Sequence, residues 1–162
     1  MTSTTDFFKV KDVVEVFQDY KKSAVLFSMC YCDWKCCKEA GIDVCHNLPI
    51  AKQENVKLTF SDALSIVNNS VTDAVLFGGL EPLLQSEEVT HLIRYFREHG
   101  VKKDIVVYTG YYIEEIDKDV LESLTQCHVI LKCGRFIPNR PSKFDDVLGV
   151  TLASDNQYGV QL

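Results

Sequence analysis

Five of the seven cysteines in this chain fall between residues 30 and 47, in a stretch that opens with Cys30-Tyr31-Cys32 and closes with Cys45-His46-Asn47. The stretch directly follows the apolar run of residues 23–27, so a buried strand would deliver a thiol-rich loop to the end of a sheet. Thiolates bind iron–sulfur clusters and zinc, and they carry redox chemistry. The sequence therefore predicts a metal or redox site in this loop.

The kind of site follows from the compartment and from the cysteine count. The start of the chain has no basic segment followed by an apolar one, and no apolar run approaches the ~18 residues of a membrane span. We therefore expect a cytoplasmic protein that does not cross a membrane. Disulfides are rare in that compartment, and an odd count of seven fits a fully paired framework poorly. These points favour an iron–sulfur cluster or zinc over a disulfide scaffold.

Three cysteines are enough for a particular kind of cluster. A [4Fe–4S] cluster held by three thiolates leaves one iron open to a small ligand. Cys32, Cys36 and Cys45 can supply these three thiolates, whereas Cys37 could replace Cys36 and Cys30 could replace Cys32. Zinc is the weaker reading, because its sites usually pair two Cys hairpins and Cys45-His46 has no matching distal pair.

The elements that must position the loop follow a regular alternation. Strands that are apolar throughout are expected at residues 23–29, 73–77, 105–108 and 128–131, with a short fifth strand near 149–152. Helices are expected at about residues 10–17, 59–70, 86–99 and 113–124. This order is typical of an α/β fold with a parallel sheet and helices outside it.

Two more loops should meet the cysteine loop at one end of the sheet, because ligands of parallel sheets bind at the carboxyl ends of the strands. They are Gly78-Gly79-Leu80-Glu81-Pro82 and Thr109-Gly110. The two adjacent glycines let backbone N–H and C=O groups approach a ligand with no Cβ in the way, and the proline fixes the turn. The sequence thus predicts one site built from three loops.

Bulk composition limits the class of partner. A chain of 162 residues with 46% hydrophobic residues is long enough for one full core, and we expect residues 1–162 to form a single domain. The formal net charge of -6 and the lack of a basic stripe argue against nucleic acid as a partner.

Together these motifs resemble the radical S-adenosylmethionine (SAM) superfamily, and within it the small activating proteins of anaerobic ribonucleotide reductase. Cys45-His46-Asn47 is similar to the Cys-His-Asn that ends the activase cluster motif, and residues 78–82 are similar to the Gly-Gly-x-x-Pro segment. Residues 108–111 and 154–157 look like the activase Tyr-Thr-Gly-Tyr and Ser-x-Asn-Gln segments. The resemblance runs from about residue 24 to the C-terminus.

One departure concerns the cysteine spacing. The superfamily usually has Cys-x3-Cys-x2-Cys, whereas Cys32, Cys36 and Cys45 are separated by three and then eight residues. A variant loop with a short insertion at residues 37–44 would reconcile the two. The pair Cys32 and Cys36 is favoured because it keeps the x3 spacing.

The resemblance implies an incomplete (β/α) barrel that binds a [4Fe–4S] cluster and SAM. Cys32, Cys36 and Cys45 would hold the cluster, and the SAM-binding residues would be Gly78, Gly79, Leu80, Glu81, Thr109 and Gly110. It implies reductive cleavage of SAM to methionine and a 5′-deoxyadenosyl radical. The partners would be a glycyl-radical enzyme, such as anaerobic ribonucleotide reductase, and a flavodoxin- or ferredoxin-like electron donor.

Two other functions remain open on the sequence. A radical SAM enzyme acting on a small molecule, like the carboxy-deazaguanine synthases, would keep the cofactor and change the substrate. A non-catalytic metal-binding protein on a degenerate version of the fold would explain the irregular cysteine spacing. Turnover of SAM separates the last of these from the other two.

Overall fold

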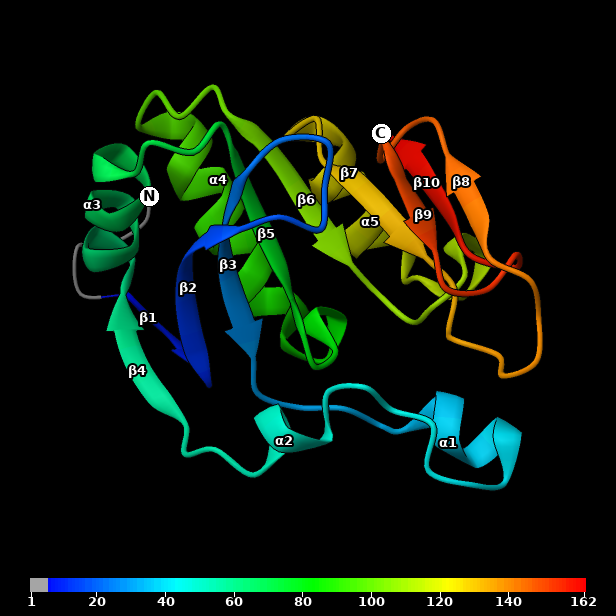
Figure 1. Cartoon of the computed structure of the whole chain (residues 1–162). Coiled ribbons are helices and arrows are strands. Elements are labelled where there is room, and N and C mark those ends of the chain that lie inside the picture. The colour runs from blue at the N-terminus through cyan, green and yellow to red at the C-terminus, as the bar shows by residue number, and fades with distance from the viewer. Residues whose placement is uncertain (1–5) are drawn as a thin grey trace.

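The computed structural model describes residues 6–162, and its centre is a mixed sheet with strand order β10-β7-β6-β5-β3-β2 (Figure 1). These strands are β2 (Asp12–Phe17), β3 (Ala24–Met29), β5 (Ala74–Gly79), β6 (Asp104–Tyr108), β7 (Ile130–Cys133) and β10 (Tyr158–Gln161). The inner strands β3, β5, β6 and β7 are parallel. All six residues of β3 are buried, as expected for a parallel strand covered on both faces.

The prediction of a wholly parallel sheet is wrong at the two edges. Strand β2 pairs antiparallel with β3, and β10 pairs antiparallel with β7. The turn between β2 and β3 spans only residues 18–23, which is too short for a parallel crossover but sufficient for an antiparallel pair. The α/β class is confirmed, and the sheet is mixed.

The helix expected at residues 10–17 is also wrong. This segment forms the end of β1 (Phe7–Val10) and all of β2, and β1 pairs with β4 (Val56–Thr59), a strand that the sequence did not predict. Val10, Val13 and Val14 match a helical spacing, but β-branched side chains favour a pleated, half-buried surface. Pairing with neighbouring strands therefore overrides the helical period.

The other expected helices form. In Figure 1, those of residues 86–98 and 118–126 lie behind the sheet, and that of residues 60–69 lies at its left side. Helix α3 (Phe60–Asn69) begins where Thr59 accepts a hydrogen bond from the Asp62 N–H at 2.9 Å. Helix α4 (Ser86–Glu98) follows the 3-10 helix η1 (Pro82–Gln85). The helix predicted at residues 113–124 is split into η2 (Ile113–Glu115) and α5 (Lys118–Gln126), because Ile116 is extended and Asp117 starts a new cap.

The fifth strand forms, but outside the main sheet. It is β9 (Val150–Leu152), which pairs with β8 (Lys143–Asp145) in a separate antiparallel hairpin. The fourth predicted strand also forms, shifted toward the C-terminus as β7.

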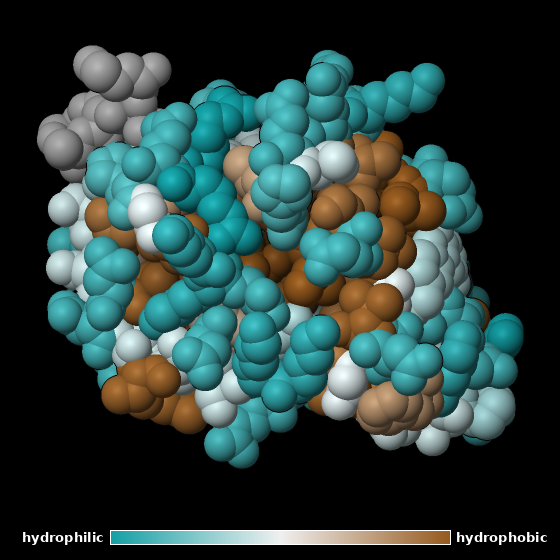
Figure 2. All heavy atoms as spheres, turned by 90° about the horizontal axis from the view of Figure 1, so that it is seen from above, coloured by the Kyte–Doolittle hydropathy of each residue, from teal (hydrophilic) through white to brown (hydrophobic). Residues whose placement is uncertain are grey.

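Apolar side chains cover both faces of the sheet. One cluster lies between the sheet and helices α3, α4 and α5, and includes Phe27, Phe77 and Phe96. The other lies on the opposite face, where Tyr20, Leu148 and Leu152 pack over it in place of a helix. From the end opposite the cysteine segment, apolar atoms form a band flanked by polar side chains (Figure 2). In the part of the chain that the structure describes, no helix is long and apolar enough to cross a membrane.

Candidate metal centre

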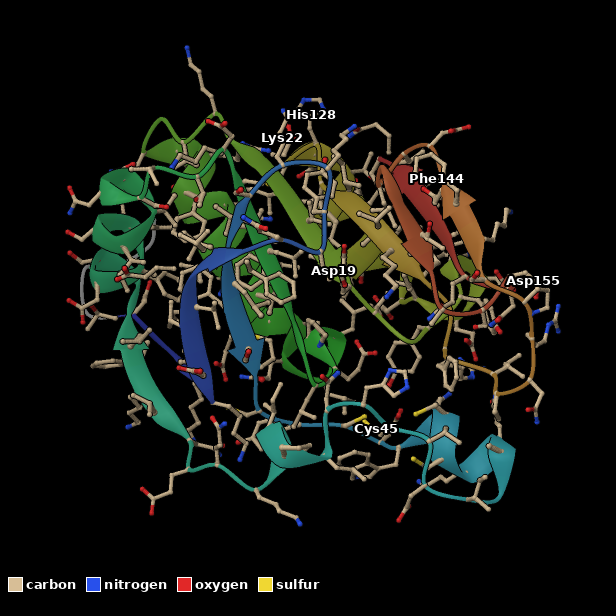
Figure 3. The ribbon with its side chains drawn as sticks, viewed as in Figure 1. Asp19, Lys22, Cys45, His128, Phe144 and Asp155 are labelled. Atoms are coloured by element: carbon tan, nitrogen blue, oxygen red, sulfur yellow. The ribbon has the colours of Figure 1, made fainter. Side chains whose placement is uncertain are left out.

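The segment that carries the five cysteines leaves β3 and crosses the carboxyl ends of the parallel strands, below them in Figure 1. It contains two short helices, α1 (Lys35–Ala40) and α2 (Leu48–Ala51). Cys45 lies between these two helices (Figure 3). The thiol-rich loop thus lies at the carboxyl ends of the parallel strands, where such sheets bind their ligands.

The three predicted loops meet around one cavity of about 210 Å³. Cys32, Cys36 and Cys45 line it from the cysteine segment. Residues 79–81 and 109–110 line it from the loops after β5 and β6. Gly78 stands behind this wall, where an added Cβ would meet Leu76 at 3.1 Å. The structure therefore brings together every predicted site residue except Gly78, which supports the wall from the strand.

The remaining cysteines lie elsewhere. Cys30 is only 5% exposed, and its N–H donates to Gln85 at 2.8 Å. Cys37 borders a separate surface depression, although its Sγ is 3.9 Å from that of Cys36. Cys127 and Cys133 are buried, as expected for core thiols. Among the cysteines of residues 6–162, the set lining the cavity is thus the favoured one, and the alternatives Cys30 and Cys37 lie outside it.

Backbone N–H groups point at two of the three thiols. The Trp34 N–H donates to the Cys32 sulfur, and the Asn47 N–H donates to the Cys45 sulfur, both at 3.3 Å. Burial raises the pKa of Cys32 to about 11 and that of Cys36 to about 12, and it also raises the pKa of Cys45. Thiols of this kind are protonated when free and release protons when they bind a metal, and N–H donors to sulfur tune a bound cluster.

The loop after β5 is tied directly to the cysteine segment. The Asn47 side-chain amide donates to the Gly79 carbonyl at 2.5 Å. Gly79 has φ +78°, and a Cβ there would lie 2.9 Å from the Ser28 Cβ on the neighbouring strand β3. Only glycine fits both this conformation and this close approach, so any side chain at position 79 would displace the backbone of the loop after β5.

Glu81 ties the loop after β5 to the loop after β6. Its buried carboxylate accepts hydrogen bonds from the Gly110 N–H at 2.7 Å, from the Leu83 N–H at 2.9 Å and from the Thr109 hydroxyl. Burial raises the pKa of Glu81, and these donors oppose that rise. A carboxylate that is buried and multiply hydrogen-bonded holds the two loops at fixed positions.

No site role was predicted for the end of β7 or for the segment that follows it. Lys132 and Phe136 line the cavity, and the Lys132 ammonium lies 4.7 Å above the Tyr108 ring. Burial lowers the pKa of Lys132. Phe136 packs against His46, with ring centroids 4.9 Å apart. The rule that gathered the first three loops applies equally to the end of the fourth strand and could have found these residues.

Comparison with known families decides the class of the chain. Residues 22–157 match the family described as 4Fe-4S single cluster domain. The chain belongs to that family. The match spans both the cysteine segment and the loops that face it, so it supports a 4Fe-4S cluster as the group bound at this site.

One curated relative of this 4Fe-4S domain has a name that describes an activity. A protein of Methanocaldococcus jannaschii named glycyl-radical enzyme activating enzyme is 30% identical over 114 residues. The alignment covers 69% of this chain and 45% of the relative, so it spans less than half the length of that protein. The two chains therefore share a domain-sized region.

The donor set of the 4Fe-4S domain fits the cluster. Thiolates are the ligands of such clusters, and hydrogen bonds to their sulfurs tune a bound cluster. Three thiols line one cavity, and two of them face backbone N–H donors.

Proposed function

We propose that this protein is a radical SAM enzyme that activates a glycyl-radical partner. The observation that carries the proposal is the meeting of Cys32, Cys36 and Cys45 with the loops after β5 and β6 around one cavity, in a chain of the 4Fe-4S family. In this proposal the three thiolates hold the cluster and leave one iron open. The domain, residues 1–162, is then a short form of the incomplete (β/α) barrel and works in the cytoplasm under anaerobic conditions.

The walls of the cavity suit SAM, which carries an ammonium, a carboxylate and a sulfonium. When bound, the cluster supplies one electron, delivered by a flavodoxin- or ferredoxin-like donor, which cleaves SAM reductively to methionine and a 5′-deoxyadenosyl radical. The backbone of Gly79 and Leu80, with Gly78 behind it, would hold the methionine end on the wall after β5. Lys132, which lines the same cavity, would supply a positive charge to pair with the SAM carboxylate.

Thr109, Gly110 and Glu81 would act chiefly through position. The Thr109 hydroxyl and the Gly110 N–H are both committed to the Glu81 carboxylate, so their backbone is fixed before any ligand binds. A cofactor that enters this cavity therefore meets preset walls, and little binding energy is lost in ordering them.

The choice of a protein substrate over a small molecule rests on the similarity to the relative. The name of the Methanocaldococcus jannaschii relative supports a glycyl-radical enzyme as the partner, whose glycine would lose a hydrogen atom to the radical.

Anaerobic reconstitution tests the proposal. The protein is loaded with iron and sulfide, reduced in the presence of SAM, and assayed for bound iron and for 5′-deoxyadenosine. We expect about four irons per chain and formation of 5′-deoxyadenosine. Binding of zinc without iron would overturn the proposal in favour of a structural metal site.

Two cysteine variants sharpen this test. Cys45→Ala removes a thiol that faces the cavity, and we expect it to abolish 5′-deoxyadenosine formation. Cys37→Ala is the matched control, because Cys37 belongs to the same segment and points to a separate depression. Loss of the cluster in Cys37→Ala and its retention in Cys36→Ala would make Cys37 the ligand in place of Cys36.

A further inference from the structure

Helix α1 carries Cys36, and its own length, burial and capping do little to stabilise it. It spans six residues, and none of them, all within the described part of the chain, is buried. Its N-cap is Trp34 at φ +60°, which provides no side-chain cap. Isolated helices shorter than ~12–15 residues are marginal in water, and most are stabilised by packing. Contacts outside the helix must therefore fix the position of Cys36.

Three polar contacts connect this part of the chain to the segments after β6 and β7. The Tyr111 hydroxyl donates to Asp33 at 2.5 Å, just before α1 begins. Lys35 lies 3.7 Å from Glu115. Near the end of the helix, Glu39 accepts from the Arg135 Nε at 2.7 Å. Both ends of α1 are thus tied to the strand-end loops that form the opposite wall of the cavity.

Arg135 is the fixed point of this arrangement. Its side chain is only 8% exposed and is held by groups that do not belong to α1. The guanidinium donates to both Glu115 carboxylate oxygens at 2.7 and 3.0 Å and to the Gly110 carbonyl at 2.9 Å. It also stacks over the Tyr112 ring at 4.7 Å. A guanidinium held by these contacts has a fixed orientation. Its Nε–H takes part in none of them and donates to Glu39.

We propose that Arg135 is a positioning residue that holds α1, through Glu39, and so sets where the Cys36 thiolate stands relative to Gly110. The inference rests on the proposed function, because it takes Cys36 as a cluster ligand. It adds a physical link between the two halves of the site: one guanidinium contacts both the loop after β6 and the helix of the cysteine segment. A shift at either half is then transmitted to the other.

Glu39→Gln weakens the link without disturbing the fold, because the amide oxygen can still accept from the Arg135 Nε but the charge of the pair is lost. The Glu39 side chain is 53% exposed, and Arg135 keeps its bonds to Glu115 and Gly110 in this variant. Glu122→Gln is the matched control, because Glu122 is an exposed acid on α5. In hydrogen exchange of the metal-free protein, we expect the amides of residues 35–41 to exchange about two- to fivefold faster in Glu39→Gln and at wild-type rates in Glu122→Gln. Unchanged exchange in Glu39→Gln would overturn the proposal.

The reconstituted protein gives the readout that a merely structural contact would not move. We expect Glu39→Gln to bind as much iron as the wild type but to differ in the electron paramagnetic resonance spectrum that the reduced cluster gives on addition of SAM. A wild-type spectrum, even with faster exchange, would overturn the positioning role. Failure of the wild type itself to bind iron would instead overturn the proposed function and, with it, this inference.

Discussion

Helices α4 and α1 are held in this protein by opposite means. Six residues of α4 are buried, namely Val89, Thr90, Leu92, Ile93, Tyr95 and Phe96. In α1, none of the residues, each described by the structure, is buried, and the polar contacts of Lys35 and Glu39 connect it to its surroundings. Hydrophobic burial is strong and non-directional, whereas ion pairs at a surface are weak but geometrically specific. Burial therefore holds the scaffold, and a few directed contacts place the cysteine segment.

The largest effect that this comparison predicts is on the scaffold. Ile93 is fully buried in the cluster between the sheet and the helices. Ile93→Ala should lower the free energy of unfolding by about 2–5 kcal/mol, because it removes apolar contacts and leaves a cavity. Chemical denaturation of the metal-free protein measures this change. A loss below about 1 kcal/mol would show that α4 does not depend on burial.

A smaller effect is expected where the scaffold meets the site. Gly79→Ala should destabilise the metal-free protein by more than Gly100→Ala, although both glycines have positive φ, +78° and +83°. The conformation alone should cost about 1–2 kcal/mol in each. At Gly79 the new Cβ would also press on Ser28 at 2.9 Å, whereas nothing lies within 4 Å at Gly100.

Chemical denaturation of both glycine variants compares their free energies of unfolding, and iron loading of each compares their iron content. Gly79→Ala should also load less iron, since a shift of its carbonyl disturbs the bond from Asn47 beside Cys45. Equal stability and equal iron content in the two variants would contradict the close approach at Gly79.

The scaffold could be predicted from the sequence to the extent that burial specifies it. The apolar runs predicted the four inner strands, and the apolar spacing of residues 86–99 predicted α4, because each signal is local. The helix expected at residues 10–17 was wrong because the spacing of Val10, Val13, Val14 and Phe17 fits a helix by coincidence. Only pairing with β3 and β4 decides between the two states. Strand β10 was not predicted, because no local sequence pattern indicates that residues 158–161 pair antiparallel with β7.

The thiols and loops of the site could be predicted from the sequence, but the hydrogen bonds and ion pairs between them could not. Residue types and their order identified the thiols and the loops after β5 and β6, since the ends of parallel strands must meet. The bonds from Arg135 to Glu39 and Glu115 join residues 96 and 20 positions apart. Such long-range polar pairs leave no periodic trace in the sequence. The cavity-lining residues at the end of β7 were overlooked for a different reason, because the rule on strand ends was applied only to the first three loops.

A modest, pH-dependent effect should distinguish the polar tethers from the core. The Arg135 guanidinium lowers the pKa of Glu115 from 4.5 to about 2 in the folded state. A lowered folded-state pKa gives stability that is fully present above the unfolded value, about 4.5, and is lost as the pH falls toward about 2. The melting temperature of the wild type should thus exceed that of Glu115→Gln at neutral pH.

This gap between wild type and Glu115→Gln should narrow between about pH 4.5 and 2. Thermal unfolding across that range measures it, and Ile93→Ala serves as the control, because an apolar deletion adds no titrating group. A gap that stays constant down to pH 2 would mean that the carboxylate of Glu115 gains nothing from Arg135.

The smallest effect is expected for the same apolar truncation moved to the cysteine segment. Ile42 follows α1 and is 64% exposed, so Ile42→Ala removes little buried area. Its free energy of unfolding should change by less than about 0.5 kcal/mol, against about 2–5 for Ile93→Ala. Because both variants delete the same atoms, the difference between them measures burial alone. A loss above 1 kcal/mol at Ile42 would mean that the cysteine segment is also held by apolar packing, and the Arg135 link would then be less important in placing Cys36.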